Sequence, residues 1–267
     1  MIRLIGVTLK AASILRYIKI RTAIIIFYIS AYAIALSVEP VNVNALLSSG
    51  DSLYQNFDYR GSASCFRQAA DLDSNGFNAF WKLSRSMNFI GELAPKDSQL
   101  ALFEGAASAA RHAIALNDKS ADAHFQLARA LGKIALFRGV LKSVGLAKQV
   151  KAEAQKTLAL DSLHDGAWHI LGRWNREVGK TPRLIRAPLG LGAANKEDAI
   201  AFMKKAIALR PAYINHHLEM GITFQEYDKK ELAREEFEIC LSLSPEGPLD
   251  NLYKEEARKH LAKIVGD

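Results

Sequence analysis

The amino-acid sequence predicts an all-α solenoid, in which pairs of helices repeat along the chain and stack on one another. From residue 43 onward, apolar and small residues recur at helical spacing in segments that come in pairs. Prolines are few, 7 in 267 residues, and alanines follow the same helical pattern. The third observation is a short motif between Trp168 and Trp174, because other segments of the chain fall into register with it.

In this motif Trp168, Leu171 and Gly172 have the spacing that opens a tetratricopeptide repeat, a helix pair of about 34 residues. Small residues at one position of the first helix and two positions of the second let the helices approach closely. Large residues at the positions between them fill the remaining space. The spacing is therefore a packing requirement, and it predicts a tetratricopeptide-type helical repeat solenoid of five helix pairs.

The first and last predicted repeats, residues 43–76 and 214–247, have the minimal length of the pattern. Gly50 and Gly221 take the small position of their first helices. Aromatic residues take the large position of the second helices, namely Phe66 and Phe237. A final helix at residues 249–265 has a polar side, and it is predicted to cap the open end of the solenoid.

The three middle repeats, residues 77–120, 121–164 and 165–213, are longer. Their extra residues are predicted to lie in the turn between the two helices, because glycine and proline interrupt the helical pattern there. Equivalent turns lie on one edge of a solenoid, so we expect these insertions to project from that edge. The predicted insertions are residues 91–97, 138–145 and 178–195.

The first 38 residues differ from the repeat domain, residues 43–267, in composition. Five basic residues and no acidic one precede Glu39, and residues 22–38 are apolar or hydroxylic and carry no charge. This pattern predicts a signal peptide or an N-terminal membrane anchor. Because the basic residues precede the apolar run, we expect the repeat domain on the non-cytoplasmic side, in the periplasm or cell envelope. An organelle presequence is the alternative for the same acid-free N-terminus.

Charge and motif content exclude several classes of function. The net charge is +7, but the five N-terminal cations account for most of it and leave +2, which gives no reason to expect nucleic acid binding. Cys65 and Cys240 lie far apart on second helices and are expected to be free thiols. The sequence has no metalloprotease, zinc-ribbon, phosphate-loop or serine-hydrolase motif. We therefore expect no cofactor, no metal and no enzymatic activity.

The repeat register also aligns a column of arginines. First helices line the concave face of such solenoids, and one inward position is arginine in three successive repeats, at intervals of 44 residues: Arg85, Arg129 and Arg173. A ring-bearing side chain lies one helical turn before each arginine. Guanidinium groups bind carboxylates or phosphates through paired hydrogen bonds, so the column suits an acidic peptide, a terminal carboxylate or a lipid head group. The predicted ligand-binding groove comprises Trp81, Arg85, Phe125, Arg129, His169, Arg173 and Arg176.

Two alternatives remain open at this point. Each arginine of the column would instead pair with a neighbouring carboxylate, such as Asp122 or Asp165, and join adjacent repeats. The second and third insertions mix basic residues with leucines, so they would either contact an anionic membrane surface or pack as loops with solvated charges. The sequence itself does not choose between these alternatives.

The chain resembles the regulator-of-microtubule-dynamics family of tetratricopeptide repeat proteins. The resemblance rests on the sequence from Leu171 to Trp174, the proline-containing insertion after it, and the following helix with Ala199, Met203 and Ala206. It extends over residues 45–265. The resemblance implies a non-enzymatic helical-repeat protein. Several members of the family have an N-terminal membrane or targeting segment, and members associate with microtubules or organelle membranes.

Taken together, these features predict a non-enzymatic scaffold that binds a protein or peptide on its concave face outside the cytoplasm. The arginine column would hold acidic groups of the partner, and Trp81 and Phe125 would form an apolar floor. The alternative is a protein that binds or carries an anionic lipid at a membrane surface. An apolar tunnel behind the arginines would favour the lipid, and an open groove with satisfied polar walls would favour the peptide.

Overall fold

A computed structural model describes residues 21–22 and 42–266 of the chain. The chain divides into two units, Met1–Asn42 and Val43–Asp267. The predicted signal or anchor, residues 1–38, lies outside the described residues except for Arg21 and Thr22, which are helical. Among the helices of the described ranges, none has both the length and the apolar character that a membrane crossing requires.

Every regular element between residues 42 and 266 is a helix. These helices begin and end as follows: α2 Val43–Gln55, α3 Tyr59–Leu72, α4 Phe77–Leu93, α5 Lys96–Leu116, α6 Ala121–Arg138, η1 Val140–Ser143, α7 Val144–Leu160, α8 Asp165–Gly179, α9 Arg183–Arg186, η2 Ala187–Leu191, α10 Lys196–Leu209, α11 Ile214–Glu226, α12 Lys230–Ser242 and α13 Pro248–Gly266.

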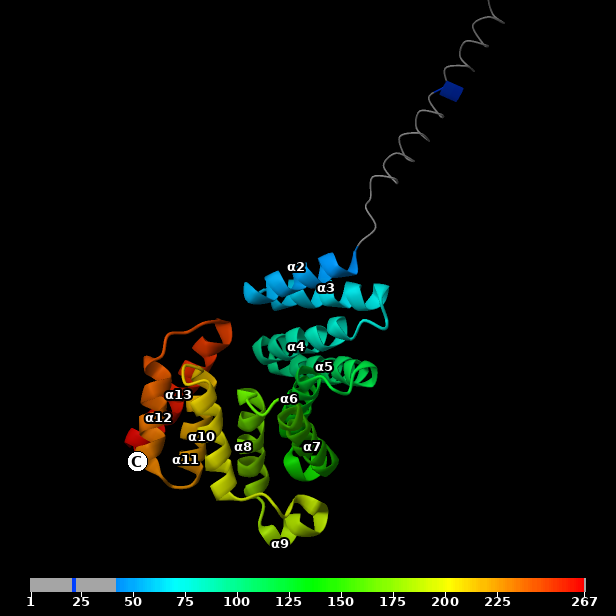
Figure 1. Ribbon diagram of the computed structural model, residues 1–267. Coiled ribbons are helices and arrows are strands. Elements are labelled where there is room, and N and C mark those ends of the chain that lie inside the picture. Colours follow the sequence, from blue (N-terminus) through cyan, green and yellow to red (C-terminus); the bar gives the residue numbers. More distant parts are fainter. Residues whose placement is uncertain (1–20, 23–41, 267) are drawn as a thin grey trace, which may run out of the picture. The chain divides into compact units, whose positions relative to one another are not determined.

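The helices pack as successive pairs, which Figure 1 shows from α2 and α3 through to α11 and α12. The pairs are α2 with α3, α4 with α5, α6 with α7, α8 with α10, and α11 with α12. The second helix of each pair also contacts the first helix of the next pair. The prediction of an all-α helical repeat solenoid is therefore confirmed.

The close approach within a pair depends on a glycine of the first helix. A Cβ atom placed on Gly50 would lie 2.5 Å from Phe66, and one placed on Gly221 would lie 2.5 Å from Phe237. Both phenylalanine rings are fully buried, so they have no room to move aside. In the fourth pair a Cβ on Gly172 would lie 3.2 Å from the Ala199 carbonyl oxygen. Glycine is required at these positions by helix packing.

The prediction that residues 91–97 form a projecting turn is wrong. Helix α4 continues to Leu93, and α5 begins at Lys96, with Pro95 as its N-terminal cap residue. The extra residues of this repeat therefore lengthen both helices. Gly91 suggested a break in the sequence, but it is buried because the Phe103 ring packs against it, 2.6 Å from where a Cβ would lie.

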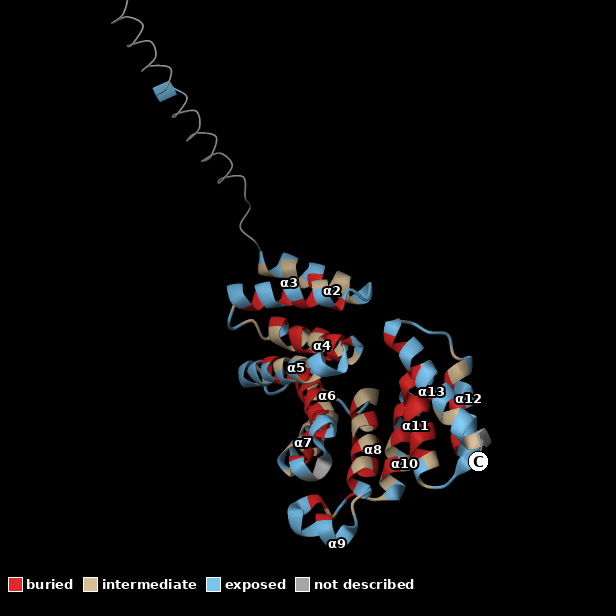
Figure 2. Cartoon of the chain, turned by 180° about the vertical axis from the view of Figure 1, so that it is seen from behind, coloured by how far each residue is buried: buried red, intermediate tan, exposed pale blue. Residues whose placement is uncertain are grey.

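The other two insertions do lie between the helices of their pairs. After α6, Gly139 has a φ of 87°, a conformation that glycine tolerates best, and the 3₁₀-helix η1 leads into α7. After α8, the short helix α9 and the π-helical turn η2 lead into α10. Figure 2 shows that α9 is largely exposed.

Helix α13 packs on α11 and α12, and it also reaches the start of the solenoid. The Tyr253 hydroxyl donates to Glu92 Oε2 on α4 at 2.9 Å, 161 positions away in sequence. Gly247, just before α13, lies against the Phe57 ring in the turn between α2 and α3. The final helix therefore joins the last repeat to the first two, in addition to covering α11 and α12.

Candidate functional site: a pocket between α6 and α8

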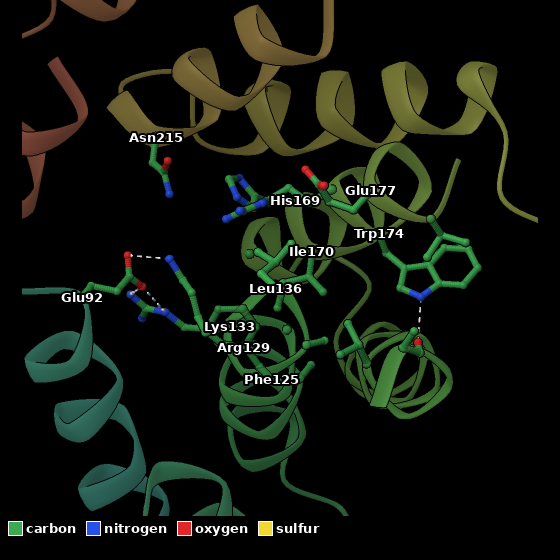
Figure 3. Close-up of a pocket in the computed structure, with 18 of the residues that line it drawn as sticks. Glu92, Phe125, Arg129, Lys133, Leu136, His169, Ile170, Trp174, Glu177 and Asn215 are labelled. Atoms are coloured by element: carbon green, nitrogen blue, oxygen red, sulfur yellow. Dashed lines mark hydrogen bonds and ion pairs between the residues drawn. The ribbon is translucent and has the colours of Figure 1, made fainter. Parts of the chain in front are cut away.

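A pocket of about 120 Å³ opens between α6 and α8, the first helices of the third and fourth pairs (Figure 3). Apolar side chains from both helices make up most of its wall, Tyr213 joins it from the α10–α11 turn, and Asn215 from the first turn of α11. The Trp174 indole is held in this wall, because its Nε1 donates to the Ala147 carbonyl oxygen at 2.7 Å. The apolar wall includes Phe125, Ala128, Leu136, Ile170, Trp174 and Val178.

The pocket exists because α6 has small residues on the side that faces α8. Ala128 and Gly132 lie one helical turn apart on this side, and both line the pocket. A Cβ placed on Gly132 would meet no atom within 4 Å. This glycine differs from Gly50 and Gly221, which are crowded by a ring. At Gly132 the missing side chain leaves open space, and that space is part of the pocket.

Two cations share one carboxylate at the mouth of the pocket. The Arg129 guanidinium donates from Nε and Nη2 to Glu92 Oε1, at 3.1 and 2.8 Å. Lys133 Nζ lies 3.0 Å from Glu92 Oε2, as the dashed lines of Figure 3 show. The centre of the Phe89 ring, on α4, lies 4.1 Å from the guanidinium carbon of Arg129. Arg129 and Lys133 thus carry one more positive charge than Glu92 neutralises.

The titration of these groups follows from burial and from their neighbours. Burial alone would raise the pKa of the Glu92 carboxyl, but Lys133 and Arg129 outweigh it and hold this pKa far below its usual range. Burial lowers the pKa of Lys133. The negative charge of Glu92 opposes this effect, and the positive charges of Arg173 and Arg129 add to it. An ammonium has three donors, and Glu92 is its one hydrogen-bonded or ion-paired partner among the described residues. Lys133 is therefore the group that would gain most from a second carboxylate.

Arg173 and Arg176 make a different arrangement, because both reach from α8 to one carboxylate on α11. Arg173 Nη1 lies 3.0 Å from Glu219 Oε1, and Arg176 Nη2 donates to Glu219 Oε2 at 2.6 Å. Arg176 is 2% exposed, and it also donates to the Glu219 carbonyl oxygen and to Thr223 Oγ1, at 3.0 and 3.1 Å. The two arginines outweigh the effect of burial and lower the pKa of Glu219 to about 2. Arg176 has no surface left for a ligand.

A histidine pair borders the pocket. His169 Nδ1 and His216 Nδ1 lie 2.8 Å apart, and His216 Nε2 lies 2.9 Å from Asp165 Oδ2. With His216 donating to Asp165, its Nδ1 accepts the Nδ1 proton of His169, so both rings are neutral. Burial, followed by the nearby His216, holds the pKa of His169 well below its usual value. Between residues 42 and 266 no three His, Cys, Asp or Glu side chains are grouped as a metal site would need.

Trp81 and Arg85 lie on α4, outside the pocket. Arg85 Nη2 donates to Asp51 Oδ1 at 3.2 Å, and its guanidinium carbon lies 3.7 Å from the centre of the Tyr54 ring. Trp81 Nε1 donates to Asn78 Oδ1 at 2.9 Å. Of the seven residues predicted to form one groove, the structure brings Phe125, Arg129, His169 and Arg173 to one pocket.

Each arginine of the column pairs with a carboxylate from another helix pair. The partners are Asp51, Glu92 and Glu219, in place of the Asp122 and Asp165 that the sequence suggested. Asp165 instead accepts from His216. The column therefore joins adjacent repeats, and two of its members also border the pocket.

Residues 46–265 match the family described as regulator of microtubule dynamics protein 1-3. The chain belongs to this family. Two bovine (Bos taurus) relatives are similar to it: regulator of microtubule dynamics protein 1 is 21% identical over 72% of this chain, and protein 3 is 23% identical over 85%. The chain spans 62% and 50% of the length of these two relatives.

A solved structure supports the same fold for this member of the regulator-of-microtubule-dynamics family. The thermophilic tetratricopeptide repeat protein TTC0263 of Thermus thermophilus superposes with a TM-score of 0.58 at 17% sequence identity. The superposition covers 84% of this chain and 99% of the other. At this level of identity the likeness shows the fold.

Several residues of the site were not predicted from the sequence. Lys133 lies four residues after Arg129 on the same face of α6, so the spacing alone would have identified it. Glu92 lies in the part of α4 where the sequence predicts a break. Glu219 and Tyr253 reach the site across other helix pairs, and no local pattern places them there.

Proposed function

We propose that this chain is a non-enzymatic protein-interaction scaffold, and that it binds a peptide segment of its partner at the α6–α8 pocket. A large apolar side chain of the partner enters the pocket. A carboxylate next to that side chain binds Lys133 at the mouth. The observation that carries this proposal is the combination of an apolar pocket, one residue wide, with an ammonium that has donors to spare.

The size of the pocket favours a peptide over a lipid. Its volume of about 120 Å³ is near that of a cavity of about 150 Å³ that holds one benzene molecule. A leucine, isoleucine or phenylalanine side chain is of this size, whereas a phospholipid acyl chain is several times longer. An anionic lipid also combines an apolar chain with an acidic group, so it is the second candidate ligand. The experiment below separates the peptide from the lipid.

The test is a selection of random peptides on the immobilised full chain, followed by affinity measurements on a selected peptide. We expect the selected peptides to share a large apolar residue beside an acidic one. Gly132→Leu fills the pocket from open space, so it should weaken binding at least tenfold while the fold is retained. Gly145→Leu is the matched control, because a side chain there also meets no atom within 4 Å and Gly145 does not line the pocket.

A second variant tests the charge at the mouth. Lys133→Gln keeps Glu92 paired with Arg129 and Tyr253, and it should weaken an acidic peptide about tenfold but leave its amide analogue unchanged. Binding of the selected peptide to Gly132→Leu as tightly as to the wild type would overturn the proposal. So would a stoichiometric phospholipid in mass spectra of the purified chain that Gly132→Leu no longer retains.

We propose further that the repeat domain lies on the non-cytoplasmic side of a membrane, in the periplasm or cell envelope. The support is the basic start and uncharged apolar run of the first 38 residues. Protease added to intact cells or spheroplasts should digest the repeat domain. Full protection of the domain, with a control cytoplasmic protein also intact, would contradict this placement.

A further inference from the structure

A second surface lies on the edge of the solenoid that the second and third insertions form. It is built by residues 139–151, which include η1 and the start of α7, and by residues 178–195, which include α9 and η2. We call it the insertion edge. The two segments pack together, since η2 contacts α7 and Leu191 shares a buried cluster with Ala147 and Val150. Neither segment contains an aspartate or a glutamate.

The insertion edge presents large apolar side chains to solvent. Leu184 is 90% exposed, and Ile185 and Leu189 are 53% and 37% exposed. Figure 2 shows α9, which holds the first two, mostly in the colour of exposed residues. Leu184 has the largest exposure among the exposed large apolar residues of the described chain. Such a group on a surface marks a contact with a partner or a membrane.

The shape of this edge is fixed by buried groups. Arg186 is buried, and it donates from Nε to the Thr181 carbonyl oxygen and from Nη1 to the Leu191 carbonyl oxygen, both at 2.9 Å. Gly190 turns the chain with a φ of 76°, a conformation that favours glycine. The leucine and isoleucine at the tip are therefore held outward by structure behind them.

Three cations around the tip have no carboxylate partner among the described residues, whereas Lys180, at the base of the insertion, pairs with Glu177 and Glu226. Arg183, Lys142 and Lys148 are exposed, and none of the three forms an ion pair with a described residue. Other exposed cations, such as Arg138 at the end of α6 and Arg234 on α12, pair with glutamates. The absence of acidic residues from both segments leaves this edge with an uncompensated positive field.

We propose that the insertion edge docks on an anionic lipid bilayer, with Leu184 and Ile185 entering the interface and Arg183, Lys142 and Lys148 facing the head groups. Apolar side chains on a projecting tip, ringed by cations, are the arrangement that peripheral membrane contacts use. A protein partner is the less suitable occupant, because the apolar residues lie on a tip and form no groove. None of these five side chains lines the pocket between α6 and α8.

The experiment measures membrane contact at position 184 itself, so that membrane binding through the N-terminal apolar segment does not decide the outcome. An environment-sensitive fluorophore is attached to the full chain through Leu184→Cys, with Cys65→Ala, since Cys240 is fully buried. The matched control is Leu163→Cys, a 71% exposed leucine in the turn between α7 and α8. The labelled chains are titrated with phosphatidylcholine vesicles that contain or lack phosphatidylserine.

We expect a blue shift at Leu184→Cys with anionic vesicles, and none at Leu163→Cys. Arg183→Gln with Lys148→Gln should raise the lipid concentration needed roughly 30-fold. Lys119→Gln with Lys204→Gln changes the net charge equally at exposed sites elsewhere, and should leave the titration unchanged. A chain that binds vesicles without a shift at position 184 overturns the proposal. An equal shift with neutral vesicles, or a shift with polyglutamate alone, overturns it as well.

Discussion

Helix α8 faces α6 on one side and α11 on the other, and the two junctions are filled differently. Against α11, Arg173 and Arg176 meet the buried Glu219, and nearly every polar group of this junction is paired. Against α6, Ala128 and Gly132 leave a pocket, and Lys133 at its mouth shares Glu92 with Arg129. The same column of arginines thus closes one junction and borders an opening at the other.

The size of the inward residues decides which junction is open. Where a long side chain and its carboxylate fill the space between first helices, the repeats are joined. Where alanine and glycine occupy the equivalent space, a partner side chain can enter.

Glu219→Gln should destabilise the closed junction strongly. It removes the carboxylate that Arg173 and Arg176 share, and Arg176 is 2% exposed, so a buried charge loses its main partner. We expect a loss of about 3–5 kcal/mol in the free energy of unfolding, measured by urea denaturation. The control is Glu238→Gln in the exposed pair with Arg234, where we expect less than about 1 kcal/mol. Equal losses in both variants would contradict the assignment of Glu219 to the closed junction.

The same carboxylate should make stability depend on acid. The pKa of Glu219 is lowered from 4.5 to about 2 in the folded chain, so the folded state binds this proton later than the unfolded state. The stabilisation is therefore fully present above pH 4.5 and is lost as the pH falls toward 2, by about 3 kcal/mol in all. Chemical denaturation between pH 7 and 3 checks this. The free energy of unfolding should depend less steeply on pH in Glu219→Gln, and an unchanged dependence on pH would contradict the prediction.

The substitutions Gly221→Ala and Gly132→Ala should change the free energy of unfolding in opposite directions. In Gly221→Ala the new Cβ lies 2.5 Å from the fully buried Phe237 ring, and we expect a net loss of about 1–2 kcal/mol. In Gly132→Ala the new methyl group meets nothing, and alanine favours the helix, so we expect a gain of about 0.5–1 kcal/mol. Thermal unfolding of both variants is the measurement. Destabilisation by Gly132→Ala would show that the pocket is not open at α6.

The repeat register could be predicted from the sequence because it is a local packing rule. The spacing around Gly172 recurs in the chain, and helices that lie next to one another are also neighbours in sequence. The first insertion was mispredicted because glycine both ends helices and permits close contact between them. Gly91 serves the second purpose, and the sequence does not distinguish the two.

The site was only partly predictable for a different reason. Repeat positions placed Phe125, Arg129, His169 and Arg173 on one face, which the structure brings to one pocket. The partners of the arginines come from other helix pairs, and their identity depends on how the pairs stack. A glycine such as Gly132 also leaves a pocket by having no side chain, so it gives no positive signal in a search for binding residues.

We propose that the α6–α8 junction accepts an apolar group with an acidic neighbour, while the α8–α11 junction is closed. Crystals of the wild type and of Gly132→Leu, soaked with 4-methylpentanoate, test it most directly, because this probe joins one branched side chain to one carboxylate. We predict that the branched end lies between Leu136 and Ile170 and the carboxylate at Lys133 in the wild type. We predict no probe at this position in Gly132→Leu. A pocket that stays empty in the wild type, or a probe bound equally in both, would contradict the claim.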